Sequence, residues 1–369
     1  MTAAVRTRKA GLNKEPGAPQ NKSCPAPRRL AEVYGGVLFV TLLFFLSFLT
    51  RNLFSPLMPT IRGELGFGPA AAGLIFLLGS IGSFVGAMIS GFVSSRIDHR
   101  GSLLVAVFLS AIALLASYFA DALWFVQMVM IVLGFSAGLT QPSVTATVAA
   151  MVSREDWGKA LSIQTSGPRV AYTAAPLLAV GLLAAFSWQL ALVAVGVLVA
   201  LCGAAFAFWG DLGRFRGTLP QLRPILETTR MRSFWLMILL FSLGVGAHAG
   251  LYGMMLLFLT GAAAILVGSL PGMGAAACVF PLAALSGCFF PPAFAALSRI
   301  VQPNFRSLAA AFIPPTGFLV GGGVVSLLLG RMGEAYTFGL GIVIAGSVIM
   351  AGSFLVFAVR LLDKLEEGC

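Results

Sequence analysis

Two arginines of this sequence stand within apolar runs, where a permanent charge is costly. Arg51 lies in LSFLTRNLFSPLMPT, at the far end of an apolar run that begins near Tyr34, and Arg169 follows Lys159 in another run. At the centre of a membrane helix a charge costs about 2.5 to 3.5 kcal/mol on insertion scales, so each arginine requires a partner or a wet cavity. Ionisable residues in such positions mark pathways for substrates or ions, which makes both arginines candidate site residues.

A stripe of polar residues accompanies Arg169. Ten residues beyond Lys159, at 1.5 Å each, place Arg169 about 15 Å deep and close to the membrane midplane. Polar residues recur around it at intervals of three and four, which puts them on one helix face that we expect to line a cavity: Ser162, Thr165, Ser166, Arg169, Tyr172 and Thr173. The alternative is an arginine bonded to backbone carbonyls that Pro168 or Pro176 leaves free.

Other polar residues within apolar runs are weaker candidates for contacting a ligand. Gln141 and Gln164 offer amide groups, and the alternative for both is a hydrogen bond between helices. His248 titrates near neutrality and gives a site pH dependence, with Tyr252 one turn later on the same helix face. The alternative for His248 is a histidine satisfied by packing.

The sequence offers no arrangement for catalysis. Of its two histidines, His99 falls in an expected loop, and His248 lies in an apolar run without an acid nearby. Neither builds a catalytic triad or a metal site. The five cysteines are scattered and lack metal-ligand spacing. We therefore expect no enzyme activity, no metal and no cofactor.

Composition places these residues in a membrane protein. The chain has 369 residues, 58% of them hydrophobic and 10% charged, with a mean hydropathy of +0.95, whereas soluble domains carry about 25% charged residues. Apolar runs long enough to cross the lipid bilayer as helices recur along the chain. They cover residues 34–55, 71–93, 102–120, 122–151, 160–183, 187–209, 234–259, 275–297, 308–330 and 335–360. We expect an all-α polytopic membrane protein with about 10 transmembrane helices.

The charges indicate a topology rather than a partner. The net charge is +11, but the basic residues lie in the N-terminal tail and in short loops of one side, so no nucleic-acid surface is expected. By the positive-inside rule both termini are cytoplasmic, and the short polar loops suit a bacterial inner membrane. The carboxylates fall in the tail, loops or span ends. Proton symport through a buried carboxylate is therefore not expected.

A polar linker divides the chain into two unequal halves. GDLGRFRGTLPQLRPILETTRMRS, residues 210–233, separates six spans from four, a division typical of transporters built from repeated bundles. The expected organisation is a disordered basic cytoplasmic tail, an N-terminal six-helix bundle, a cytoplasmic linker, a shortened C-terminal bundle and a cytoplasmic tail. These parts correspond to residues 1–30, 31–209, 210–233, 234–361 and 362–369.

One long segment resembles a known family. LTRNLFSPLMPTIRGELGFGPAAAGLIFLLGSIGSFVGAMISGFVSSRIDHRG is similar to the first two helices and the following loop of the major facilitator superfamily. The likeness continues through GLTQPSVTATVAAMVSREDWGKALSIQTSGPRVAYTAAPLL. It implies two helix bundles that work by alternating access. Full members have six spans in the second half, and here the eighth helix and most of the ninth are expected to be missing.

The loop after the second helix departs from the family pattern. The resemblance implies a gating role for this loop, with Gly91, Arg96 and Arg100 at family positions and Ser95 where the family has an aspartate. Asp98 is the candidate replacement for that acid. The alternative for Asp98 is a solvated loop charge.

The first helix resembles two anion-carrying branches of the family. LTRNLFSPLMP is similar to segments of the organophosphate:phosphate antiporters and the anion:cation symporters, where an arginine meets the negative group of the substrate. The resemblance implies that Arg51 faces the cavity; the alternative is that it snorkels to the outer interface. His248 aligns with a second arginine of the organophosphate branch, and Pro168, beside Arg169, with a histidine.

Together these features predict a monomeric secondary active transporter of a small organic anion. Its substrate-binding residues would be Arg51, Arg169, Tyr172, His248, Tyr252, Gln141 and Gln164. One alternative is efflux of hydrophobic or amphiphilic compounds, which the 30 phenylalanines favour. Another is a degenerate membrane scaffold or assembly protein that transports nothing.

Overall fold

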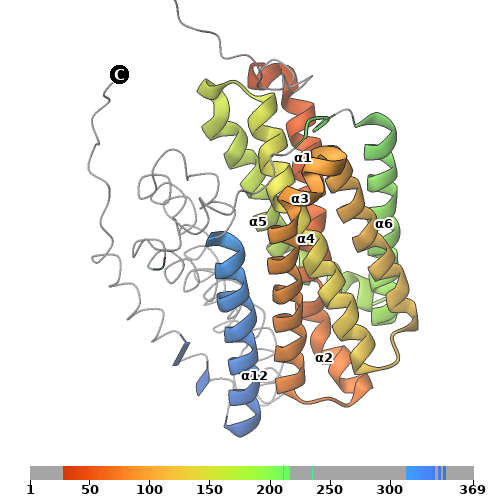
Figure 1. Cartoon of the computed structure of the whole chain (residues 1–369). Helices are drawn as coiled ribbons and strands as arrows, with labels where there is room; N and C mark the ends of the chain where they lie inside the picture. Colours follow the sequence, from red (N-terminus) through yellow and green to blue (C-terminus); the bar gives the residue numbers. More distant parts are fainter. Residues whose placement is uncertain are drawn as a thin grey trace, which may run out of the picture.

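The computed structural model describes residues 28–210, 212–216, 235, 313–336, 340, 341, 344 and 345, and these residues form an α-helical assembly (Figure 1). Its longer helices are α1 (Leu30–Asn52), α2 (Phe54–Leu65), α3 (Pro69–Ala116), α4 (Leu123–Met151), α5 (Trp157–Leu183), α6 (Trp188–Trp209) and α12 (Val325–Ala335). Shorter elements are η1 (Ser117–Phe119), η2 (Arg154–Asp156) and the π-helix η5 (Phe318–Val324). Predicted spans between residues 234 and 297 lie outside the described residues.

Several of these helices are suited to a bilayer. Within the described residues, five stretches are long and apolar enough to cross a membrane: Leu30–Leu65, Pro69–Phe119, Leu123–Met151, Trp188–Phe208 and Ile313–Ala335. The prediction of an all-α polytopic membrane protein is confirmed. Helix α5 falls outside this set because its stripe of hydroxyl, amide and guanidinium groups makes it more polar than its neighbours.

The first helix runs further than the apolar run predicts. Helix α1 passes through Leu53, which keeps helical angles, into α2, so that the stretch Leu30–Leu65 has 36 residues. Pro56 lacks an N–H and cannot bond to the carbonyl of Asn52, which accounts for the break in the hydrogen-bond ladder. Helix α2 ends at Gly66, which adopts a left-handed φ of 69°. Arg51 therefore lies inside a continuous helical rod of about 54 Å rather than at its end.

Helix α3 contains a sharp kink at Asp98, where the sequence predicts a loop. Asp98 has φ 67° and ψ 173°, a region that side-chain-bearing residues rarely adopt. Its Oδ1 accepts a hydrogen bond of 2.6 Å from the backbone N–H of Gly101 and so caps the second leg. A helix of 48 residues would measure about 72 Å if straight, more than twice the thickness of the hydrocarbon core. The kink therefore separates two crossings.

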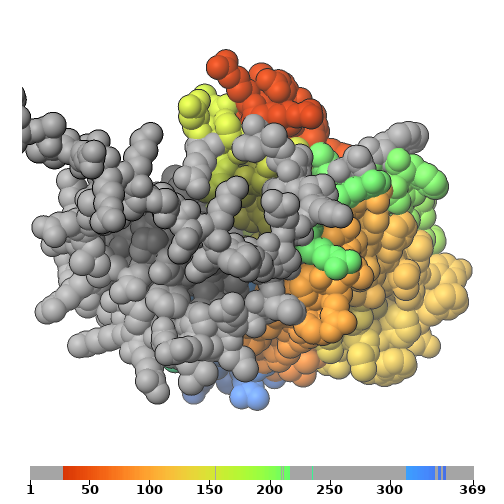
Figure 2. All heavy atoms as spheres, turned by 45° about the horizontal axis from the view of Figure 1, so that its top comes forward, coloured from red at the N-terminus to blue at the C-terminus, as the bar shows by residue number. Residues whose placement is uncertain are grey.

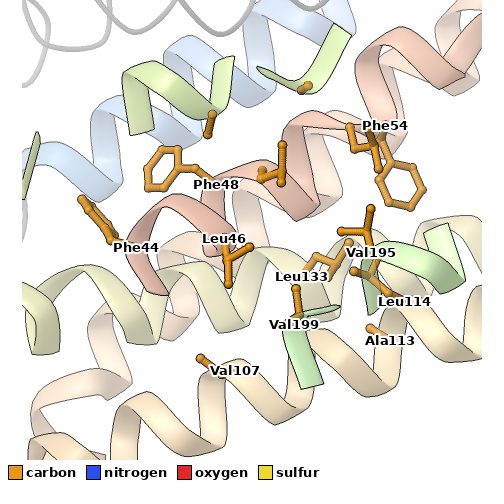
Figure 3. Close-up of a cluster of buried hydrophobic side chains, with 14 of the residues drawn as sticks. Phe44, Leu46, Phe48, Phe54, Val107, Ala113, Leu114, Leu133, Val195 and Val199 are labelled. Atoms are coloured by element: carbon orange, nitrogen blue, oxygen red, sulfur yellow. The ribbon is translucent and has the colours of Figure 1, made fainter. Parts of the chain in front are cut away.

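Close packing of small residues holds the bundle together. A Cβ at Gly82 of α3 would collide with the backbone oxygen of Ile131 in α4, and one at Gly134 with that of Gly79. Because these residues lack side chains, the two backbones approach within contact distance. Apolar side chains of α1, α3, α4 and α6 fill the remaining interior (Figure 3).

The upper end of the bundle in Figure 1 holds the chain's first described residues against the α4–α5 turn. The backbone N–H of Arg28 donates to Met151 O at 3.0 Å, and Ser153 N–H donates back to Arg28 O at 2.9 Å. Leu30 N–H donates to Asp156 Oδ2 at 3.2 Å. This bond, together with the ammonium of Lys159, holds the pKa of Asp156 below its ordinary value. We call this set of contacts the N-terminal clasp.

The same end holds residues 212–216 against the kink of α3 (Figure 2). His99 N–H donates to Phe215 O at 3.1 Å, and Arg100 N–H donates to Gly213 O at 2.9 Å. The guanidinium of Arg100 donates to Gly210 O and to Ala207 O, both at 2.6 Å. These carbonyls belong to the C-terminal end of α6, where a cation also complements the helix dipole.

Candidate functional site

Arg51 is half-buried and points across the bundle rather than along its own helix. Its Nη1 donates to Ser83 Oγ of α3 at 3.3 Å. The guanidinium carbon also lies 5.9 Å from the ring centroid of Phe48 and 5.8 Å from that of Phe318, within the range of cation–π attraction. Within the described residues Arg51 makes no ion pair. These contacts direct its side chain toward α3 and η5.

An aromatic cluster adjoins this guanidinium. Phe48 makes edge contacts with Phe44 at 5.2 Å, Phe318 at 6.2 Å and Tyr172 at 6.3 Å between ring centroids. Figure 3 shows Phe44 and Phe48 extending from α1 on one side while Leu46 extends on the other. The cluster thus joins helices of the first half to η5 of the second half.

Tyr172 connects the two arginines that the sequence singles out. Its side chain is buried on α5, and the charges of Arg51 and Arg169 both act on its hydroxyl group. The amide of Asn52 also lies near this hydroxyl, and its buried nitrogen donates no hydrogen bond of good geometry within the described residues. Arg51, Asn52, Tyr172 and half-buried Arg169 therefore bring several donor groups together.

The two glutamines differ in their surroundings. Gln164 is 3% exposed, and its Nε2 donates to Thr145 Oγ1 at 2.8 Å, linking α5 to α4. This is the cross-helix bond that the sequence offers as the alternative to ligand binding. Gln141 is half-buried on α4, and its backbone oxygen accepts from Thr145 Oγ1 at 3.1 Å.

The candidate gating residues do not gather into one charge cluster. Arg96 is exposed and its guanidinium lies 5.3 Å from the ring of Phe92, whereas Asp98 caps its own helix. Arg100 bonds to the end of α6. Gly91 lies half-buried on the first leg of α3.

The predicted site residues and those that the structure brings together differ in two ways. His248 and Tyr252 lie outside the described residues. Four residues that contact or adjoin the arginine site are absent from the sequence prediction: Phe48, Asn52, Ser83 and Phe318. Asn52 directly follows Arg51 in sequence, but only the fold places Ser83 and Phe318 there. In the described part of the chain no cluster of three or more His, Cys, Asp or Glu side chains suits a metal ion.

The described helices and their charged interior define a polytopic membrane protein with the architecture of a carrier. The sequence matches the Major Facilitator Superfamily over residues 40–313, about three quarters of its 369 residues. The chain belongs to the Major Facilitator Superfamily. Membership indicates a membrane transporter rather than an enzyme. No curated protein matches the chain in sequence.

Solved structures of membrane transporters share this fold. A bacterial homolog of the human lysosomal transporter Spinster, inward-facing and unoccupied, has a TM-score of 0.68 and 15% identity, over 89% of this chain and 86% of that one. A D-xylose-proton symporter has a TM-score of 0.68 and 14% identity, over 89% of this chain and 98% of the symporter. A POT family transporter in complex with 5-aminolevulinic acid has a TM-score of 0.66 and 12% identity, over 89% of this chain and 96% of that transporter. At these identities the likeness concerns the fold alone.

Proposed function

We propose that this transporter carries a small organic anion by alternating access and binds it at Arg51 and Arg169. The observation that carries the proposal is the half-buried guanidinium of Arg51, which makes no ion pair within the described residues. A charge held away from water needs a counter-charge or strong hydrogen bonds. The serine hydroxyl at 3.3 Å, the nearby Tyr172 hydroxyl and two ring faces supply no counter-charge.

The neighbouring groups favour a negative ligand. Asn52 and Tyr172 add donors beside the two arginines, and a carboxylate or phosphate accepts several hydrogen bonds at once. Phe44, Phe48 and Phe318 supply an apolar wall for the organic part. We further propose that both termini face the cytoplasm of a bacterial inner membrane, that the protein is a monomer, and that its second half is shortened.

A second candidate is efflux of an amphiphilic compound. The aromatic cluster that contacts Arg51 supports it, because aromatic walls hold apolar molecules without charge. The two proposals differ in what the arginines do: an anion requires their charge, whereas a neutral amphiphile requires only the rings. A transport-inactive scaffold would bind neither ligand.

Thermal unfolding of the purified full-length protein, with ligands present, tests the proposal. Benzoate and glycerol 3-phosphate serve as anionic probes and benzyl alcohol as the neutral one. At saturating ligand, binding raises the unfolding midpoint by mass action. We expect an anion to stabilise the native protein and the Arg331→Gln variant, in which an exposed arginine of α12 loses the same charge, but not Arg51→Gln or Arg169→Gln.

The opposite pattern contradicts an anion site. Stabilisation by benzyl alcohol that survives both interior substitutions assigns the aromatic cluster to amphiphile binding. Uptake of the radiolabelled stabilising compound into proteoliposomes then separates a carrier from a protein that only binds.

A further inference from the structure

The helix that brings Phe318 to Arg51 has an unusual backbone. Residues Phe318–Val324, with sequence FLVGGGV, form a seven-residue π-helix that continues directly into α12. π-Helical segments are rare, are mostly single-turn insertions, and occur frequently at functional sites. The segment begins with the ring that covers Arg51 and includes three buried glycines, Gly321, Gly322 and Gly323. Glycine also lowers the cost of a change in backbone conformation.

The other end of this helix is fixed against α3. A Cβ at Gly73 of α3 would lie 2.6 Å from Ser326 O, and one at Gly330 of α12 would lie 2.5 Å from Pro69 O. Glu334 Oε1 accepts a hydrogen bond of 2.9 Å from Ala70 N–H, in the first turn of α3. Figure 1 shows α12 alongside the first leg of α3 at the lower end of the bundle. A shift at Phe318 must therefore be absorbed by the π-helix or transmitted to these contacts.

We propose that Phe318 is a positioning residue that couples occupancy of Arg51 to the packing of α12 on α3. The inference deepens the proposed anion site and rests on it for the part played by the ligand. In the described structure the guanidinium faces the rings of Phe48 and Phe318. An anion that takes the N–H groups of Arg51 neutralises the charge that attracts both rings.

The two rings respond differently to that neutralisation. Phe48 belongs to the same helix as Arg51 and is held by edge contacts with Phe44 and Tyr172. Phe318 lies on the π-helix, in the other half of the transporter, and has an edge contact with Phe48 but none with Phe44 or Tyr172 among the described ring contacts. Its release lets the segment rewind from π toward α geometry. Rewinding turns α12 relative to α3 and loosens the contact between Ser326 and Gly73.

Cysteine labelling of the full-length protein in detergent tests this coupling. The five native cysteines are replaced by serine, and Ser326, which is 2% exposed, is changed to cysteine as the reporter. We expect Phe318→Leu to accelerate reaction with a water-soluble maleimide about fivefold without ligand, which equals about 1 kcal/mol. Benzoate should accelerate labelling of the Phe318 parent and add little in Phe318→Leu.

Controls separate coupling from general loosening of the helix. Phe44→Leu removes a ring of the same aromatic cluster that packs against Phe48. This variant should label like the parent. Phe318→Tyr keeps a ring face and should also label like the parent. In an Arg51→Met background the Phe318→Leu change should add no acceleration, because the attraction that it removes is already absent.

The outcomes distinguish the two proposals. Equal ligand-free rates for the parent and Phe318→Leu overturn the coupling, even if benzoate binds through Arg51. Acceleration that persists unchanged in the Arg51→Met background also overturns it. Acceleration that depends on Arg51, with no benzoate effect in any variant, supports the link from Arg51 through Phe318 to the packing of α12 and counts against an anion site.

Discussion

Arg100 and Arg51 show two ways in which this protein holds a guanidinium. Arg100 donates to two carbonyls at 2.6 Å each, at the end of a helix whose dipole favours a cation. Arg51 has one serine hydroxyl at 3.3 Å, the nearby hydroxyl of Tyr172 and two aromatic faces. The first arrangement satisfies the group through the protein's own backbone. Within the described residues the second supplies fewer strong acceptors, so the comparison separates an arginine that stabilises the fold from the one that we propose binds the ligand.

Substitution of Arg100 should have the largest effect on stability. Arg100→Met removes two charge-assisted hydrogen bonds and leaves the carbonyls of Ala207 and Gly210 without these donors. We expect a loss of about 2 to 3 kcal/mol in the free energy of unfolding, seen as a lower unfolding midpoint in detergent. Arg100→Lys should recover only part of it, since a lysine cannot reproduce the planar fork. A midpoint equal to that of the native protein would contradict the structural role of Arg100.

Acidification should have a smaller effect through the neighbouring residue, His99. This side chain is 7% exposed and lies at the kink that separates the two crossings of α3. Its ring centroid is 4.7 Å from that of Phe215, and its Nδ1 is 3.4 Å from Ser143 Oγ. Burial lowers the pKa of His99 below 6.5, and the opposing charge of Asp98 raises it less. The folded protein thus favours neutral His99. Its contribution to stability is complete above the ordinary pKa and is lost as the pH falls below it.

The pH dependence is measured by unfolding at about pH 7.5 and about pH 5.5, on either side of the ordinary histidine pKa. The native protein should lose more stability on acidification than His99→Gln, which cannot take up the proton. Because both proteins share every other titratable group, their difference isolates His99. Parallel pH profiles would mean that the buried imidazole titrates as it does in the unfolded chain.

Substitution of Arg51 should have the smallest effect on stability. Arg51→Met removes a half-buried charge together with its contacts to two neutral hydroxyls, so the gain in desolvation offsets the loss of contacts. We expect the free energy of unfolding to change by less than about 0.5 kcal/mol while the stabilisation by anions disappears. A loss as large as that for Arg100→Met would erase the distinction between the two arginines.

The sequence predicts much of the first half because hydrophobicity along the chain is a local property. The apolar runs up to residue 209 correspond to helices, and the positions of Arg51, Arg169 and Tyr172 in those runs mark the interior that the structure brings together. Local patterns mislead at turns. The end of the apolar run near residue 55 predicts the end of a helix that continues to Leu65, and the polar residues at 94–101 predict a loop where α3 only kinks.

Contacts between distant segments are beyond such patterns. Phe318 is one of 30 phenylalanines, and nothing in its local sequence indicates that its ring covers Arg51. Ser83 is likewise one small residue among many on α3. His99 has the sequence context of a solvated loop, yet residues 213–215 cover it. Each of these placements depends on which elements pack together, which is decided by the whole chain.

The N-terminal clasp also bears on how the protein is made. Arg28 pairs with Met151 and Ser153, and Leu30 with Asp156, 126 positions later in the chain. A ribosome that has just delivered the first helix to the membrane has not yet synthesised those partners. The N-terminal end of the first helix therefore reaches its final contacts only after the start of the fifth helix has been synthesised. Final assembly of this half thus follows translation of about its first 160 residues rather than proceeding helix by helix.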